Sequence, residues 1–182
     1  RPDPTILDGR FANNGWLQEL PKPFTKITWD NVILISPASA EKLGIGRRIG
    51  STGGERGSIY ADTIELECNG RRVRGAAWIL PGQADDCLTV HLGYGRTRAG
   101  RVGNQLGFDA NAIRSAATPW GVGGAVLRQL GQQYPVACTQ FHQLMEGRDL
   151  IRAGTLEQYR GDPEFARAGE KDGTDAGQTR GR

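Results

Sequence analysis

The chain has 182 residues, of which 37% are hydrophobic and 24% charged, with a net charge of +3 at neutral pH. This length provides one domain with a hydrophobic core and a tail, and no stretch reaches the run of about 18 apolar residues that a membrane-spanning helix needs. The charge is too small to indicate a nucleic-acid-binding protein by itself, and the three cysteines and two histidines lack the spacing of a metal site.

The segment up to residue 44 predicts one strand and one helix after an irregular start. Four prolines among the first 23 residues disfavour regular structure there. An apolar, β-rich run at 32–35 predicts a strand. Ser36 and Pro37 are typical of a helix start and Gly44 of a helix end, so we expect a short helix between them.

The middle of the chain predicts mostly β-structure. A glycine- and arginine-rich loop is expected at 47–57. Asn69-Gly70 between two alternating runs predicts a hairpin over residues 58–80, because Asn-Gly fits the tight turn that joins twisted antiparallel strands. A further strand is expected at 88–92. Because the helices are few and short, the pattern favours a β-barrel with small helices over an open parallel sheet, which needs helical crossovers.

The last third of the chain predicts short elements and then disorder. The expected elements are one or two helical turns at 111–117, a mixed segment at 121–130, a closing strand at 136–141 and a short helix at 155–159. Residues 171–182 have the composition of a disordered segment. We therefore divide the chain into a β-barrel domain at 1–150 and a charged connector with a disordered tail at 151–182.

Residues 93–107, which we call the glycine loop, are the strongest candidate for a binding site. They include five glycines and three arginines and no acidic residue. Glycine lets the backbone approach a ligand closely, consecutive backbone N–H groups form anion-binding concavities, and guanidinium groups bind phosphate oxygens in pairs. The composition therefore predicts a loop that holds a phosphate or pyrophosphate, with a solvent-exposed connection between strands as the alternative.

The glycine loop fits neither of two common phosphate-binding motifs. The dinucleotide fingerprint GxGxxG requires glycine where Arg98 stands. The P-loop requires lysine followed by serine or threonine where Arg101 and Val102 stand. A phosphate site here therefore belongs to another architecture.

Two stretches near the start of the chain supply candidate partners for a heterocyclic ring. Trp16 stands among amides and a carboxylate, so its ring lies beside hydrogen-bonding groups; the alternative is that it packs on the core. Asp30 follows a second tryptophan. Its carboxylate can accept both N–H donors of a guanine edge, or it can cap a turn.

Four motifs occur in order along the chain and resemble a known family. They are WLQELP, TKITWDN, ISPASAEKLGI and HLGYGRTRAGRVGNQLGF, which begin at residues 16, 25, 35 and 91. Together they resemble the C-terminal, molybdopterin-dinucleotide-binding domain of the molybdopterin oxidoreductases, and within that superfamily the large iron–sulfur, molybdopterin-like subunit of alternative complex III. FHQLMEGR at 141–148 and the TLEQY…PEFA stretch at 155–166 extend the likeness and look like the connector to that subunit's ferredoxin-like domain.

The resemblance implies a double-psi β-barrel that binds part of a molybdopterin guanine dinucleotide. It places Trp16, Gln18 and Glu19 near a pterin or guanine edge. It places Asp30 and Asn31 at the nucleotide end of the cofactor. The loop residues that it places at phosphate or pterin groups are Gly93, Gly95, Arg96, Thr97, Arg98, Gly100 and Arg101.

The resemblance also implies partners and a location. The family's molybdenum ligand and iron–sulfur cysteines lie in other domains, so we expect a domain that binds no metal and is not catalytic in isolation. The implied partners are the molybdopterin-like and ferredoxin-like domains of the same subunit and other subunits of a bacterial membrane complex, on its periplasmic side. The sequence begins at Arg1 without a methionine, so we expect a soluble fragment, without its own membrane span, of a larger protein.

Three hypotheses about function follow. The first is a cofactor-binding domain of a respiratory oxidoreductase subunit that resembles a molybdopterin guanine dinucleotide site. The second is a cofactor-free structural domain of the quinol-oxidising alternative complex III, in which the site is vestigial. The third is a nucleic-acid-binding β-barrel that uses Tyr94 with the loop arginines. It ranks last because aromatic and basic residues do not alternate along a strand face, and we expect no nucleic-acid partner.

Overall fold

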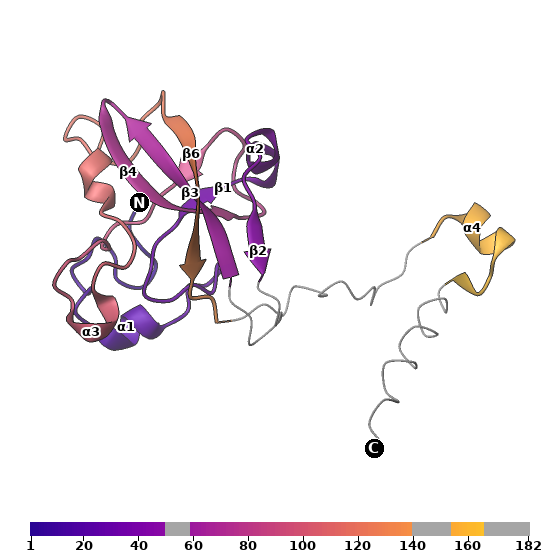
Figure 1. Ribbon diagram of the computed structural model, residues 1–182, viewed down its shortest axis with the longest axis horizontal. Helices are drawn as coiled ribbons and strands as arrows, with labels where there is room; N and C mark the ends of the chain where they lie inside the picture. The colour runs from indigo at the N-terminus through magenta and orange to yellow at the C-terminus, as the bar shows by residue number, and fades with distance from the viewer. Residues whose placement is uncertain (50–58, 140–153, 166–182) are drawn as a thin grey trace, which may run out of the picture. The chain divides into compact units, whose positions relative to one another are not determined.

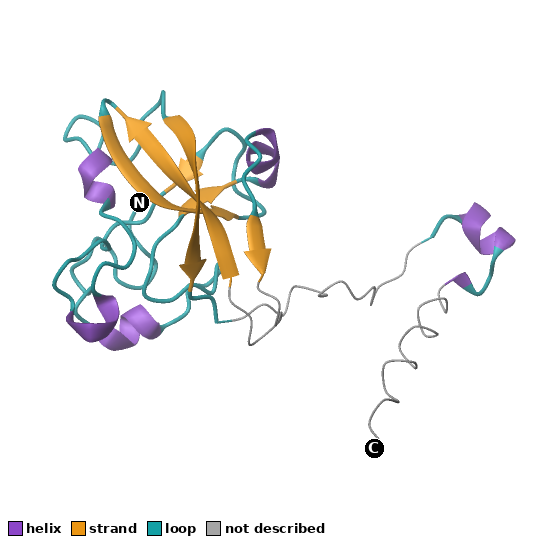
Figure 2. Ribbon diagram, in the orientation of Figure 1, coloured by secondary structure: helices purple, strands orange, loops and turns teal. Residues whose placement is uncertain are grey.

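The computed structural model describes residues 1–49, 59–139 and 154–165. The chain divides into two compact units, Arg1–Phe141 and His142–Arg182. Figure 1 shows the strands of the first unit, and Figure 2 distinguishes them from the helices and loops. The boundary predicted at residue 150 and the disorder predicted for 171–182 lie outside the described residues and stay predictions.

The strands of the first unit form one mixed sheet. They run in the order β2-β3-β4-β1-β5, and β6 pairs with β3 in addition. Only the pair β1 and β4 is parallel; the other neighbours are antiparallel. The strands are β1 (Ile33–Ile35), β2 (Arg47–Ile49), β3 (Ile59–Cys68), β4 (Arg71–Ile79), β5 (Leu88–Thr89) and β6 (Val126–Val136).

The predicted hairpin is confirmed. Strands β3 and β4 pair from Thr63 opposite Ala76 to Cys68 opposite Arg71. Asn69 and Gly70 join them with φ angles of 51° and 73°, the positive values that a type I′ turn requires at both central residues.

The predicted helix after Ser36 is also confirmed, as α2 (Pro37–Lys42). The Ser36 hydroxyl accepts the backbone N–H of Ser39 at 3.1 Å, and Gly44 ends the helix with a φ of +63°. The expected helix near residue 155 is present as α4 (Leu156–Gly161), capped by Thr155. The remaining helices are α1 (Gly15–Glu19), α3 (Gly100–Gly103) and the 3₁₀ helix η2 (Ala110–Ile113).

Several predicted boundaries are wrong. The closing strand expected at 136–141 lies earlier in the chain, as β6, which ends at Val136 and pairs along β3; residues 140 and 141 lie outside the described residues. The side chains of β6 are mostly exposed, so it lacks the apolar pattern of a buried strand. The strand expected at 88–92 stops at Thr89. Beyond it the chain bonds Arg1: the Arg1 ammonium donates to the Val90 carbonyl at 2.7 Å, and the Leu92 N–H donates to the Arg1 carbonyl at 3.1 Å. The loop expected at 47–57 begins with strand β2, and its remainder from residue 50 lies outside the described residues.

The architecture is mainly β with a few short helices, and the sheet is open. Among the described strands, no pairing joins β5 to β2 or β6. An isolated antiparallel bridge between Ile27 and Cys138 links the chain after β6 to the segment before β1. The double-psi topology that the resemblance implies is therefore a proposal, taken up below.

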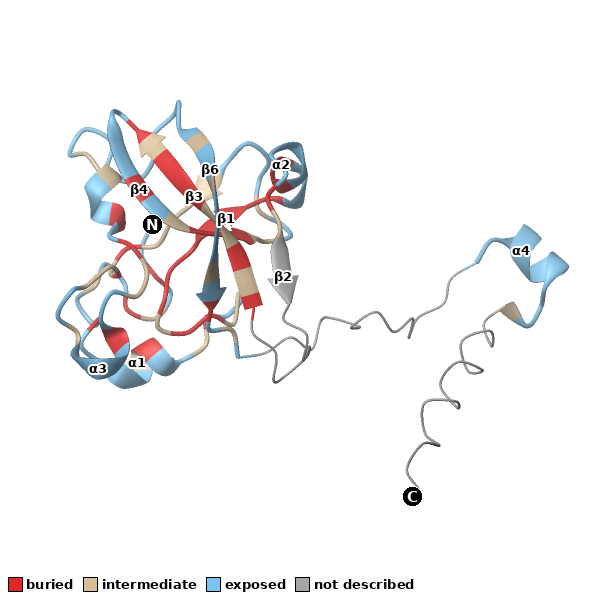
Figure 3. Cartoon of the chain, viewed as in Figure 1, coloured by how far each residue is buried: buried red, intermediate tan, exposed pale blue. Residues whose placement is uncertain are grey.

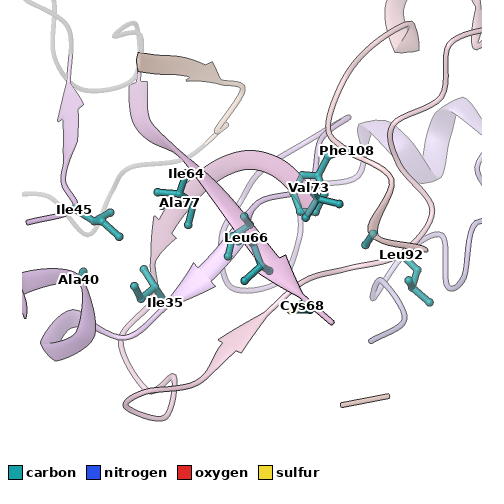
Figure 4. Packing of buried hydrophobic residues seen from close by; sticks show 12 residues of the cluster. Ile35, Ala40, Ile45, Ile64, Leu66, Cys68, Val73, Ala77, Leu92 and Phe108 are labelled. Carbon is teal, nitrogen blue, oxygen red and sulfur yellow. The ribbon is translucent and has the colours of Figure 1, made fainter. Parts of the chain in front are cut away.

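Clusters of buried side chains among the described residues hold the unit together. The main cluster includes Ile33 and Ile35 of β1 and Ile64 and Leu66 of β3 (Figures 3 and 4). The smaller one, Ile6, Ala12 and Tyr94 with Leu17 against it, connects the N-terminal segment to the glycine loop. No helix in the described ranges is long and apolar enough to cross a membrane.

Candidate functional site

The glycine loop closes on itself through backbone hydrogen bonds. The N–H of Gly95 donates to the Leu106 carbonyl at 3.1 Å, and the N–H of Gln105 donates to the Arg96 carbonyl at 2.8 Å. Helix α3 forms the tip of the loop. The loop is therefore a closed excursion with a fixed base, rather than an extended connection between strands.

Asn31 holds the base of the loop through hydrogen bonds of its side chain. Its side-chain N–H₂ donates to the carbonyls of His91 and Phe108 at 2.8 and 3.0 Å, and its oxygen accepts the N–H of Phe108 at 2.9 Å. Asn31 is buried. One side chain thus ties together the two chain segments that enter and leave the loop.

The N-terminal segment packs directly on the loop. Arg96 donates to the Asn13 side chain at 2.6 Å. The Trp29 ring lies between the first residue of α1, Gly15, and the last residue of α3, Gly103. Helices α1 and α3 consequently lie side by side (Figure 1).

A buried ion pair fixes the same interface. The Lys22 ammonium lies 3.2 Å from the Asp3 carboxylate, which also accepts the Tyr94 hydroxyl at 3.1 Å. Burial alone would raise the pKa of Asp3, but the backbone N–H groups of Thr5 and Ile6, together with Lys22, hold that pKa below its usual value. Asp3 therefore stays ionised and anchors the loop through Tyr94.

Asp30 is a buried carboxyl group directly beneath the loop. A Cβ atom added to Gly107 would lie 2.9 Å from its Oδ1, so the backbone passes immediately above it. The Tyr134 hydroxyl hydrogen-bonds the Asp30 carboxyl and receives the N–H of Gly107. Burial raises the pKa of Asp30 to about 6, against the opposing effect of the Tyr134 hydrogen bond.

Replacing Asp30 by asparagine is expected to stabilise the domain at neutral pH. The raised pKa lies about two pH units above the ordinary 3.8, so ionising Asp30 costs the fold about 3 kcal/mol above pH 6. The folded state binds a proton that the unfolded state lacks between about pH 4 and 6, so this contribution to stability falls as pH rises through that window.

The free energy of unfolding of Asp30→Asn should therefore be about 1–2 kcal/mol higher than that of the unmodified chain at pH 7. This is less than the full cost of ionising Asp30, because the new amide N–H₂ also lacks a partner. Urea unfolding of both proteins at several pH values measures the difference, which should grow from pH 4 to 6 and then stay constant. Asp109→Asn is the matched control, because Asp109 is an exposed cap of η2 whose role asparagine can fill. A difference that does not change with pH would contradict the raised pKa.

Two of the predicted site residues carry buried oxygens without a partner. Asp30 Oδ1 and Gln18 Oε1 are the only buried side-chain polar atoms in the described part of the chain that make no hydrogen bond. The Gln18 N–H₂ donates to the Ala12 carbonyl at 3.1 Å. Such unpaired acceptors are uncommon in proteins and mark places where a donor is missing.

The other predicted site residues divide by exposure. Gly93 and Gly95 lie at the packed base of the loop, where added Cβ atoms would meet Gly9 and Asp109 within 3 Å. Trp16 is 86% exposed. Neither the Arg98 nor the Arg101 guanidinium makes a hydrogen bond or ion pair to a described residue. The exposed predicted residues are Trp16, Glu19, Thr97, Arg98, Gly100 and Arg101.

Sequence reasoning missed four residues that shape the site. Asn13, Trp29 and Gly107 stand inside or beside quoted motifs, but nothing in the sequence indicates their contacts. Tyr134 lies on β6, outside every quoted motif, and only the fold brings it to Asp30.

The glycine loop lines neither of two cavities that lie among the described residues. The smaller, of about 140 Å³, is lined by Asp30, Asn31, Lys22 and His91 among others. Burial lowers the pKa of His91 to about 4, so this imidazole is neutral at pH 7. Within the described ranges, no three His, Cys, Asp or Glu side chains gather as a metal would need.

The site fits the phosphate part of a dinucleotide better than its base. Arg98 and Arg101 expose two guanidinium groups on a loop with a fixed base, which suits phosphate oxygens. The polar groups of Asn31 are already occupied within the protein, and Gln18 is buried. A guanine or pterin ring at this surface would therefore meet the exposed Trp16, because Gln18, Asp30 and Asn31 are all buried.

No protein-family model and no curated protein matches the chain. The resemblance to molybdopterin oxidoreductases consequently rests on the motifs alone.

Proposed function

We propose that the chain is a cofactor-binding-type domain of a molybdopterin oxidoreductase-like subunit in a respiratory complex. The observation that carries the proposal is a pair of guanidinium groups, Arg98 and Arg101, that bond no described residue. They stand on the closed glycine loop, next to the helix that exposes Trp16 (Figure 1). The loop would hold the phosphates of a molybdopterin guanine dinucleotide, and that group would supply the redox chemistry while this domain binds and orients it.

The proposal extends to fold and surroundings. The bridge between Ile27 and Cys138 brings the chain after β6 back to the segment before β1, which supports a barrel of the double-psi type. The exposed side of the loop would be covered by the other domains of the subunit and by further subunits of a bacterial membrane complex, on the periplasmic side.

A second candidate is a cofactor-free structural domain of alternative complex III. The saturated hydrogen bonding of Asn31 favours it, because a residue expected to recognise a nucleotide instead holds the scaffold. The exposed arginines would then pair with carboxylates of neighbouring domains.

Guanosine diphosphate, which combines a guanine base with a pyrophosphate, separates these candidates. Under the first proposal it binds the chain, and Arg98→Ala with Arg101→Ala should weaken binding at least tenfold, because each charge-assisted hydrogen bond contributes about 1.5–3 kcal/mol. The melting temperature should change little, since both side chains are exposed. Isothermal titration calorimetry and thermal unfolding provide the two readouts.

The control is the double variant Arg72→Ala with Arg128→Ala, which removes the same charge from exposed positions on β4 and β6. Equal weakening in both variants would indicate a nonspecific charge effect. No binding to the unmodified chain would reject the cofactor proposal in favour of the structural domain. Tighter binding of a single-stranded oligonucleotide, lost steeply with salt, would instead support nucleic-acid binding.

A further inference from the structure

The larger cavity lies apart from the glycine loop. It has a volume of about 790 Å³ and opens between the end of the sheet and residues 118–127. That volume is within the range of roughly 300–1,000 Å³ found for small-molecule sites. No residue of the glycine loop lines it, so a ligand here would be independent of the proposed dinucleotide.

The walls of this cavity are mainly apolar. Leu88, Val90, Ile113 and Leu127 all pack against the main core, are only partly buried and line the cavity. The buried thiol of Cys68 also lines it, and burial raises the pKa of that thiol, which keeps it neutral. Figure 4 shows Cys68 at the end of β3, beyond Leu66. Incompletely covered apolar side chains around a hollow of this size suit an apolar ligand.

The segment that borders the cavity on its outer side packs loosely. Cβ atoms added to Gly121, Gly123 or Gly124 would meet no atom within 4 Å. Trp120 is 62% exposed although it lines the cavity. This border therefore leaves room for a further apolar body without displacing packed side chains.

The charged residues at the cavity leave an excess of positive charge. They are Arg1, Arg114 and Asp86, and Lys42 lies 3.5 Å from the Asp86 carboxylate. Arg114 is held in place: its Nε donates to the Pro119 carbonyl at 2.9 Å, and its guanidinium stacks 4.4 Å from the Trp120 ring centroid. Its terminal nitrogens bond no residue in the described part of the chain, so they can pair with an anionic group.

We propose that this cavity binds an apolar molecule that carries a single anionic head group, of the kind represented by a fatty acid. The tail lies against Leu88, Val90, Ile113 and Leu127, and the carboxylate pairs with Arg114.

Dodecanoate tests the proposal, and dodecyltrimethylammonium serves as the ligand control because it has the same tail and the opposite charge. Calorimetry with the 182-residue chain should show binding of dodecanoate at least tenfold tighter than the ammonium compound. Arg114→Met should remove this preference, because one charge-assisted contact is worth about a tenfold change or more. Arg128→Met removes a charge from β6 outside the cavity, so this variant should still prefer dodecanoate to the ammonium compound.

Thiol labelling provides a readout that needs no variant. Cys87 is exposed and lines the cavity, whereas Cys138 does not line it. Bound dodecanoate should slow the reaction of Cys87 with a maleimide and leave that of Cys138 unchanged. Equal affinity for the two ligands, or equal labelling of Cys87 with and without dodecanoate, would overturn the proposal. A stable dimer that excludes dodecanoate would overturn it too, and would assign the cavity to a second copy of the chain.

Discussion

Replacing Asn31 by alanine is expected to lower the free energy of unfolding by about 3 kcal/mol. The substitution removes three hydrogen bonds and leaves the N–H and carbonyl of Phe108 and the carbonyl of His91 without their partner. An unsatisfied buried group costs about 1–3 kcal/mol, and water can reach the partly buried His91 carbonyl. The lost free energy of unfolding should therefore correspond to one or two unpaired buried groups. Urea unfolding of Asn31→Ala and the unmodified chain at neutral pH measures this difference.

Asn13→Ala is the matched control for this experiment. Asn13 is also an asparagine bonded to the glycine loop, through Arg96, but its contact is exposed. Exposed substitutions of this kind usually change stability by no more than about 0.5 kcal/mol. If Asn31→Ala lowered the free energy of unfolding as little as Asn13→Ala, Asn31 would not hold the loop. The conclusion that Asn31 stabilises the scaffold and does not contact a nucleotide would then be wrong.

The effect on ligand binding separates two roles for Asn31. Substituting a residue that only contacts the ligand lowers the affinity and leaves the free energy of unfolding unchanged. Asn31→Ala should instead lower both quantities, because a loop with a loosened base no longer presents Arg98 and Arg101 in one arrangement. The loss of affinity for guanosine diphosphate relative to the loss of unfolding free energy therefore distinguishes a ligand contact from a scaffold residue, even when binding is weak.

Local signals in the sequence predicted the elements that depend on local contacts. Asn69-Gly70 specifies its turn through two positive φ angles, and Ser36 caps α2 within three residues. Strand β6 has no comparable signal, because its order comes from pairing with β3, about 70 residues earlier in the chain. Helix α1 was missed because its five residues stand in a proline-rich segment, although Asn14 caps it.

The candidate site shows the same division. The composition of the glycine loop predicted a phosphate-holding loop, with a solvent-exposed connection as the alternative. The structure shows a loop closed at its base with Arg98 and Arg101 exposed, and phosphate binding stays a prediction. The role of Asn31 could not be predicted, because its partner Phe108 is 77 residues away. The contact between Asp30 and Tyr134 likewise depends on the sheet that carries Tyr134. Residue type thus suggested candidate groups for binding, and only the fold decided which of these groups face solvent and which contact each other.

Replacing Gly95 by alanine is expected to have the largest effect of any single substitution proposed, a loss of about 4 kcal/mol or failure to fold. Gly95 has a φ of +77°, and its added Cβ would lie 2.3 Å from the backbone nitrogen of Asp109 and 2.6 Å from the carbonyl carbon of Phe108. Backbone atoms cannot move aside as the end of a flexible side chain can. The substitution therefore adds steric overlap to the cost of a left-handed conformation.

Gly100→Ala separates the cost of steric overlap from the cost of a left-handed conformation. Gly100 lies in the same loop and has the same backbone conformation as Gly95, but it has no close neighbour. Its φ is +76°, and no atom lies within 4 Å of the added Cβ. The expected loss is about 1–2 kcal/mol, the cost of a left-handed conformation for an L-residue. Denaturant unfolding of the two variants should thus differ by at least about 2 kcal/mol. If Gly95→Ala folds and the two losses are equal, the base of the loop is not packed as tightly as these distances require. If Gly95→Ala fails to fold while Gly100→Ala folds, the close approach of the chain at Gly95 is essential to the domain.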